Sequence, residues 1–163
     1  TINPPAGWFK TSSDNPITVT AYNSPNEDQE DAEPPLIVYY RPHLEVQVQE
    51  NPVKTLEEAA AIFHQNNKSS YENYTVAQEN KTTVNNIPAY YVDLTAVGKG
   101  IKIHGVCYLM VKEGFVINVC GNSLASAWDK NRGAITASIN TFSFTNYPCG
   151  LLSIICTFNS LLF

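Results

Sequence analysis

The hydrophobic residues of the chain are densest between residues 101 and 121, where two apolar runs flank Glu113-Gly114. A two-residue turn at this point places Cys107 directly opposite Cys120. Successive side chains of a strand point to opposite faces, and consecutive residues of both runs are apolar, so such a hairpin carries apolar side chains on both faces. An antiparallel strand with one face in water alternates apolar and polar residues instead. We therefore predict that residues 101–121 form the centre of a sheet that is covered on both faces.

Shorter runs rich in β-branched and aromatic residues predict further strands. They lie at 17–22, 36–40, 44–49 and 74–78, with another inside 83–97. Residues 23–35 are polar, acidic and flanked by prolines, which predicts an exposed loop. Turn residues at 85–86 and 98–100 then make residues 74–121 a meander of about four strands.

Two segments carry helix signals. Thr55 is followed three residues later by Glu58, the spacing of a capping box, and an apolar face continues to Phe63. This first helix should fade by residues 66–67, which are both asparagine. A second helix, capped by Ser123 or Ser126, is predicted to end near residue 140 and to precede a short closing piece at 141–144.

Length and charge restrict the organisation and the partners. The chain has 163 residues and a net charge of −5, with 10 Lys and Arg scattered along it. We assign residues 1–146 to one domain and 147–163 to an apolar C-terminal tail of unknown role.

Without a basic cluster, nucleic acid and anionic lipid are excluded as partners. No apolar run reaches the roughly 18 residues of a transmembrane helix, so membrane association would need segments outside this sequence. The chain begins at Thr1 without Met, which we interpret as a processed or trimmed start.

Several short motifs follow the order of these elements. They are Pro5-Ala-Gly-Trp8, Thr55-Leu-Glu-Glu58, Asn86-Ile-Pro-Ala-Tyr90, Gly98, Trp128 and Phe142-Ser-Phe144. In these positions the chain resembles the PsbP-like family, relatives of the extrinsic photosystem II subunit with bacterial and archaeal secreted members. The resemblance spans about residues 4–145 and implies an α+β fold, an α/β/α sandwich with a central antiparallel sheet. The flexible N-terminal segment of the photosynthetic members has no match, so a role in oxygen evolution does not carry over.

The four cysteines form two pairs with different contexts. Cys107 and Cys120 fall at a non-hydrogen-bonded position of the predicted hairpin, where a cross-strand disulfide is geometrically possible. Such a bond closes a short loop and contributes about 3 kcal/mol. The alternative is a pair of buried free thiols. Cys149 and Cys156 belong to the tail, and neither pair has the spacing of a zinc site.

Three N-x-[Ser/Thr] sequons lie close together in a polar stretch and are candidates for glycosylation: Asn67, Asn73 and Asn80. The modification requires export from a glycosylating cell. The alternative is chance, because this chain is rich in asparagine.

Two groups of residues are candidates for metal binding. The acidic residues Asp28, Glu30 and Asp31 are able to gather a divalent cation, although the turn glycine of an EF-hand is missing and a solvated loop is the alternative. His104 lies opposite Asp93 if the preceding turn uses residues 98–99, and not if it uses 99 alone or 99–100. A facing pair would suit acid–base chemistry or a metal. The alternative is a histidine on the strand surface.

The sequence carries no nucleophile elbow, phosphate-binding loop or zinc-protease motif. We therefore expect no enzyme activity and no cofactor. A composition rich in Asn, Thr and Ser is more common in secreted proteins. The leading hypothesis is a non-catalytic, extracytoplasmic domain, secreted or at the cell surface, that binds a partner protein or surface complex. The alternative is a module that binds a small ligand or a divalent metal.

Overall fold

The computed structural model describes residues 1–31 and 37–144. One antiparallel sheet has the strand order β1-β2-β5-β9-β8-β7-β6. Its strands are β1 Phe9–Thr11, β2 Thr18–Asn23, β5 His43–Glu50, β6 Glu72–Val84, β7 Ile87–Gly98, β8 Ile101–Lys112 and β9 Phe115–Leu124. The remaining elements are strands β3 Asp28–Asp31 and β4 Ile37–Tyr40, helices α1 Leu56–Ser70 and α2 Trp128–Ile139, and a short helix η1 Ala125–Ala127.

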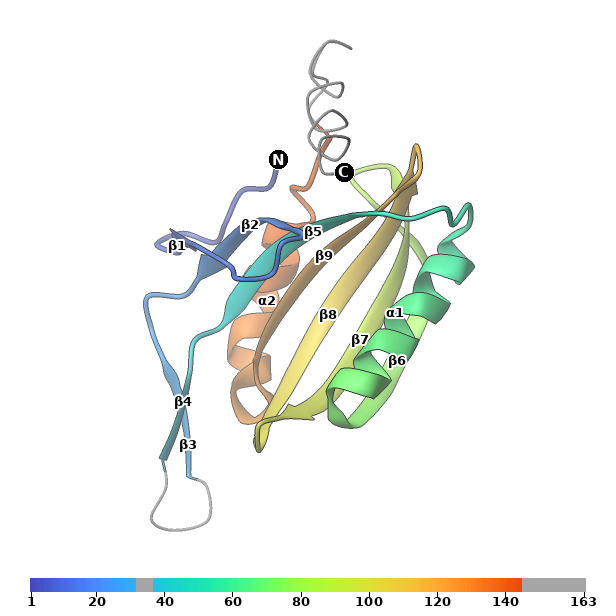
Figure 1. Ribbon diagram of the computed structural model, residues 1–163. Helices are drawn as coiled ribbons and strands as arrows, with labels where there is room; N and C mark the ends of the chain where they lie inside the picture. The colour runs from blue at the N-terminus through green and yellow to red at the C-terminus, as the bar shows by residue number, and fades with distance from the viewer. Residues whose placement is uncertain (32–36, 145–163) are drawn as a thin grey trace, which may run out of the picture.

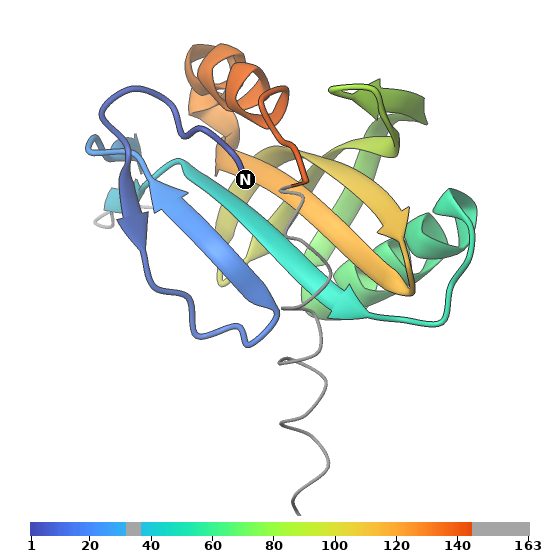
Figure 2. The ribbon, with the colours of Figure 1, turned by 90° about the horizontal axis from the view of Figure 1, so that it is seen from above.

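The two helices lie on opposite faces of the sheet (Figures 1 and 2). Helix α1 contacts β6, β7 and β8, whereas α2 contacts β9 and β8 on the other face. Strands β3 and β4 form a separate hairpin that extends away from the sheet (Figure 1). The predicted α/β/α sandwich is confirmed, and the predicted central hairpin is β8–β9, with β9 fourth among the seven strands.

Each face of the sheet has its own apolar core. Under α2, the members include Val106, Met110, Ile117, Val119, Trp128, Ile135 and Ile139. Under α1, they include Ala60, Val92, Leu94, Cys107, Leu109 and Cys120. Burying one large apolar side chain stabilises a fold by about 1.5–3 kcal/mol. The hairpin therefore stabilises the domain from both sides, as its apolar pattern predicted.

Tight turns fix the register of the four-strand meander. Each of its three hairpins has a two-residue loop in which both φ angles are positive, as a type I′ turn requires. The loops are Asn85-Asn86 with φ of 48° and 65°, Lys99-Gly100 with 52° and 78°, and Glu113-Gly114 with 50° and 84°. The last of these sets Cys107 opposite Cys120, so the predicted register is confirmed.

The region predicted as an exposed loop over 23–35 contains strand β3, which pairs with β4. The prediction was wrong for residues 28–31, where tertiary contacts hold a strand that has no apolar alternation, and residues 32–35 lie outside the described part of the chain. The buried carboxylate of Asp28 accepts hydrogen bonds from Lys130 Nζ at 2.9 Å and Asn131 Nδ2 at 2.7 Å, both from α2. Strand β6 is also longer than predicted, since an edge strand tolerates polar side chains.

The predicted boundaries of α1 and α2 were partly wrong. The capping box of α1 is present, with Glu58 N to Thr55 Oγ1 at 3.1 Å, but the helix continues to Ser70. Helix α2 begins at Trp128 without a side-chain cap. Ser123 is buried at the end of β9, and Ser126 donates to Glu30 instead. No helix in the described ranges is long and apolar enough to cross a membrane.

Residues 145–163 lie outside the described part of the chain. They hold Cys149, Cys156 and the predicted apolar tail, so the proposed boundary at residue 146 stays a prediction.

Candidate functional site

Helix α1 covers only one half of its sheet face. A single residue, Tyr71, joins the end of α1 to the start of β6, and this short connection holds the helix over β6, β7 and β8. On the same face, β5 and the side of β9 next to β5 have no helix above them (Figure 1). A groove of about 180 Å³ lies between α1 and these strands.

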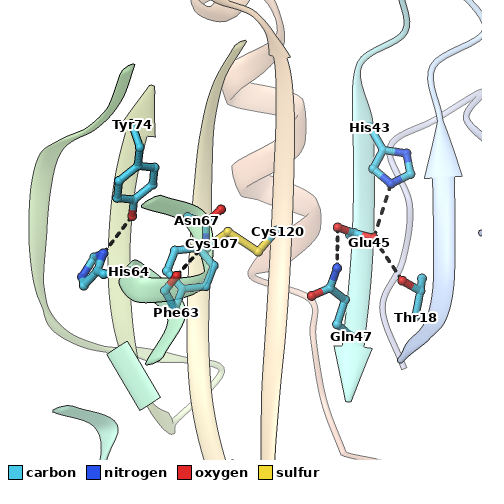
Figure 3. The surroundings of a disulfide bond; sticks show 10 residues. All are labelled: Thr18, His43, Glu45, Gln47, Phe63, His64, Asn67, Tyr74, Cys107 and Cys120. Atoms are coloured by element: carbon cyan, nitrogen blue, oxygen red, sulfur yellow. Dashed lines mark hydrogen bonds and ion pairs between the residues drawn. A yellow bond between two sulfur atoms is a disulfide. The ribbon is translucent and has the colours of Figure 1, made fainter. Parts of the chain in front are cut away.

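The floor of the groove changes from apolar to polar across the sheet. Strand pairing places Glu45 beside Cys120 and Gln47 beside Asn118, all on the face that carries α1. Asn122, two residues after Cys120 on β9, lines the same groove. The disulfide between Cys107 and Cys120 lies on the floor, between the polar residues of β5 and helix α1 (Figure 3).

The wall of the groove is a face of α1 that is pinned to the sheet. Phe63 packs against the core under the helix. Asn67 Nδ2 donates to the backbone oxygen of Phe63 at 2.8 Å. His64 Nδ1 lies 2.7 Å from Tyr74 Oη (Figure 3). Its Nε2 lies 2.9 Å from Glu79 Oε2, and both contacts tie the helix to β6. Burial of the Tyr74 hydroxyl raises the pKa of this residue to about 12. The wall is therefore a fixed surface.

Cys107 and Cys120 form the disulfide that the predicted register allowed. Their Cα atoms are 4.2 Å apart, the close approach of a non-hydrogen-bonded pair. Both residues are less than a tenth exposed. The bond therefore ties β8 to β9 at the centre of the sheet and forms an apolar part of the groove floor.

Glu45 is the centre of a hydrogen-bonded network (Figure 3). Gln47 Nε2 donates to Glu45 Oε1 at 2.8 Å, and Thr18 Oγ1 donates to Oε2 at 3.2 Å. His43 Nε2 lies 3.7 Å from Oε2. Burial by itself would raise the pKa of Glu45, but His43, Gln47 and Thr18 outweigh burial and hold that pKa below its ordinary value. The network therefore keeps Glu45 ionised at neutral pH.

Two asparagines of β9 complete the polar side. Asn122 Oδ1 accepts a hydrogen bond from Tyr40 Oη at 2.5 Å. Burial, together with the nearby Tyr71 and Glu45, raises the pKa of Tyr40 to about 12, so its hydroxyl remains a donor. Asn118 Oδ1, by contrast, is buried and has no hydrogen-bond partner among the described residues. Leaving a buried acceptor unpaired costs about 1–3 kcal/mol. Among the described residues that line the groove, it is the one buried side-chain polar atom without a hydrogen-bond partner.

Gly105 keeps the floor low beside Asn122. A Cβ atom at this position would lie 2.8 Å from the backbone oxygen of Gly121 and 2.9 Å from Asn122 Cβ. Any larger residue would therefore push against the backbone of β9 and fill one end of the groove.

His104 and Asp93 lie together, although not in the way that sequence reasoning considered. The turn uses Lys99-Gly100, so Thr95 is opposite His104. The side chains of His104 and Asp93 nevertheless meet diagonally on one face, with Nε2 to Oδ1 at 2.6 Å. The prediction that this turn does not place Asp93 opposite His104 is confirmed, and the diagonal contact was not considered. The His104 ring stacks on Trp128 at 4.6 Å, and Asp93 is buried, so the pair packs beneath α2 rather than facing the groove.

The candidate metal ligands are not brought together. No group of three or more His, Cys, Asp or Glu residues suited to a metal occurs within residues 1–31 and 37–144. Asp28 binds Lys130 and Asn131, and Glu30 accepts from Ser126 at 2.9 Å. The side chain of Asp31 lies outside the described part of the structure.

The three sequons occupy different environments. Asn73 and Asn80 are exposed on the edge strand β6. Asn67 is half-buried in the last turn of α1, lines the groove and uses its amide for Phe63. Glycosylation stays a prediction, and Asn73 and Asn80 are the accessible acceptors.

Sequence reasoning missed the groove itself. The signal was present in β9, where Asn118 and Asn122 interrupt an apolar face at a spacing of four residues. A second signal lay in β5, whose polar positions Glu45 and Gln47 share the face of the disulfide. Both patterns become a site only when α1 leaves this half of the sheet uncovered.

No protein-family model and no curated protein sequence matches the chain. Solved structures do resemble it. Cyanobacterial PsbP from Synechocystis is 11% identical with a TM-score of 0.57, covering 86% of this chain and 84% of that one. LpqN of Mycobacterium tuberculosis, described as involved in cell envelope biogenesis, is 10% identical with a TM-score of 0.55, covering 86% and 79%. A Pseudomonas aeruginosa protein of unknown function is 7% identical with a TM-score of 0.55, covering 87% and 100%. The chain therefore has a PsbP-like fold.

Proposed function

We propose that the chain is a non-catalytic, extracytoplasmic domain that binds an extended segment of a partner protein in the groove beside α1. The observation that carries the proposal is the lining of the groove. Gln47, Asn118 and Asn122 present amide groups beside the apolar surface of Phe63 and the disulfide. Amides both donate and accept hydrogen bonds, so they complement the backbone of a polypeptide.

The size and chemistry of the groove favour a partner segment over the two alternatives. Its volume of about 180 Å³ is below the roughly 300–1,000 Å³ of small-molecule sites. A divalent cation prefers several oxygen ligands with carboxylates among them. Glu45 alone supplies a carboxylate to the described lining, and both of its oxygens already accept hydrogen bonds.

Two observations support an extracytoplasmic setting. Disulfides persist in oxidising compartments, and Cys107 and Cys120 are placed to form one. One protein of similar fold is described as involved in cell envelope biogenesis. The non-catalytic part of the proposal rests on His104 and Asp93, the acid–base pair considered from sequence, which pack under α2.

Site-specific photo-crosslinking in the native host tests this proposal. A photoreactive residue at Asn66, exposed on the groove wall, should capture one partner protein. The matched control is Gln65, the adjacent exposed helix residue that does not line the groove. An adduct at 66 that is absent at 65 supports the proposal. The same adducts at both positions, or none at 66, would refute it.

A further inference from the structure

The polar side chains of the groove are largely bound inside the protein. Glu45 is the only described lining residue with a formal charge, and its two oxygens accept from Gln47 and Thr18. Asn122 Oδ1 accepts from Tyr40, which leaves the Asn122 amide nitrogen as a donor for a ligand. A charged ligand therefore finds no free partner here, whereas a backbone carbonyl finds a donor.

Much of the remaining lining is apolar. Besides the disulfide, it includes large side chains from the helix and from several strands: Ile17, Ile62, Phe63, Leu94, Ile103 and Val116. Apolar side chains that leave water for such a surface gain free energy in proportion to the area buried, and a charged side chain would lose its hydration. The groove therefore suits an uncharged, apolar stretch of polypeptide.

The chain itself contains a segment with this chemistry. The apolar tail, residues 147–163, has no Asp, Glu, Lys, Arg or His, and Leu, Ile and Phe make up most of residues 151–163. A groove of about 180 Å³ takes a short stretch of such a tail rather than the whole of it.

The described chain stops beside one end of the groove. Lys112 Nζ lies 4.3 Å from the ring centre of Phe144, the last described residue, and Lys112 is next to the turn Glu113-Gly114. The backbone N–H of Asn51, which lines the groove, donates to the oxygen of Gly114 at 2.9 Å. Phe144 packs against the core under α2, so the chain must pass around this turn to reach the other face.

The remaining length of chain is sufficient for this path. Residues 145–163 are 19 residues, which span up to about 60 Å when extended. Strand β8, with 12 residues, is about 40 Å long. The whole groove therefore lies within reach of the tail.

Building on the proposed function, we propose that the apolar tail, residues 147–163, docks in the groove of its own chain and is displaced when a partner segment binds. Its apolar side chains pack on Phe63 and the disulfide, and one of its backbone carbonyls accepts from Asn122. Because the tail is tethered, it competes at an effective concentration of the order of millimolar. The tail thus regulates access to the groove.

Photo-crosslinking of the purified, full-length chain tests this docking in the absence of any partner. A photoreactive residue at Asn66, on the groove wall, should form an adduct within the chain to a peptide from residues 147–163, identified by mass spectrometry after proteolysis. Gln65, which is exposed but does not line the groove, is the matched control and should form none. No tail adduct at 66, equal tail adducts at 65 and 66, or an adduct that joins two chains would overturn the proposal.

Substitutions in the tail separate apolar docking from chance contact. Replacing Leu152 and Ile155 together by serine removes two large apolar side chains and should weaken docking at least about tenfold, with loss of the adduct at 66. Replacing Asn146 and Asn159 together by serine changes only polar side chains and should leave the adduct in place. The same yield of adduct from both variants would contradict docking through apolar side chains.

The proposed function is scored separately, by capture of a partner in the native host. The serine variant of Leu152 and Ile155 should capture more partner at residue 66 than the unchanged tail, because the competing segment is weakened. Equal capture would overturn the regulatory role of the tail. A tail adduct in the purified chain without partner capture by either chain would refute the proposed function and support tail docking. Partner capture without a tail adduct would do the reverse.

Discussion

Replacing Cys107 and Cys120 together by valine removes the covalent bond between β8 and β9 and keeps apolar side chains in place. The two residues are 13 positions apart in sequence. In the chain-entropy model, closing a loop of this size stabilises the folded state by about 3 kcal/mol. For a domain of this size, each kcal/mol changes Tm by about 2–4 °C. We therefore expect the valine variant to melt about 6–12 °C below the oxidised protein.

Thermal unfolding followed by circular dichroism measures this difference. Cys149 and Cys156 are replaced by serine in every sample, so that a reductant acts only on the central pair. Reduction of Cys107 and Cys120 should lower Tm by nearly the same amount as the valine pair. If the oxidised, reduced and valine proteins melt within about 2 °C of one another, the cross-link does not stabilise the sheet and the loop-closure reasoning is wrong.

Three further predictions concern groups outside the cross-link. The pKa of Glu45 is lowered in the folded state, so the ionised carboxylate stabilises the fold at pH values above its ordinary pKa of 4.5. This contribution to the free energy of unfolding is lost as the pH falls through the folded pKa. When urea midpoints are measured between about pH 3 and about pH 7, those of Glu45→Gln should therefore decline less on the acid side than those of the wild type. Asp93→Ala should destabilise the domain by about 1–3 kcal/mol, since it leaves His104 without its partner at 2.6 Å, and unchanged urea unfolding would argue against this. Expression in a glycosylating, secreting host should add glycans at Asn73 and Asn80, and an intact mass equal to that of the bare chain would exclude them.

The centre of the fold was predictable because its information is local. The run from residue 101 to 121 is apolar on both faces, and Glu113-Gly114 suits a tight turn, so both burial and register follow. The capping box at Thr55 and Glu58 is likewise a contact within four residues, and the structure forms it.

What could not be predicted depends on contacts between distant elements. Strand β3 is held by Asp28 reaching Lys130, about a hundred positions away in sequence. The His104–Asp93 pair is diagonal, so reasoning about directly opposite residues missed it. The groove exists because α1 lies over one half of the sheet, where it contacts β6, β7 and β8, strands that follow it in the sequence.

Binding of a partner segment in the groove is tested most directly by NMR, which maps the residues of the labelled protein that the segment contacts. The partner captured from residue 66 would be added, as a purified segment, to the labelled protein. We predict that the largest shifts fall on Gln47, Asn118 and Asn66, which line the groove. Shifts confined to the edge strand β6 or to the β3–β4 hairpin would contradict the account.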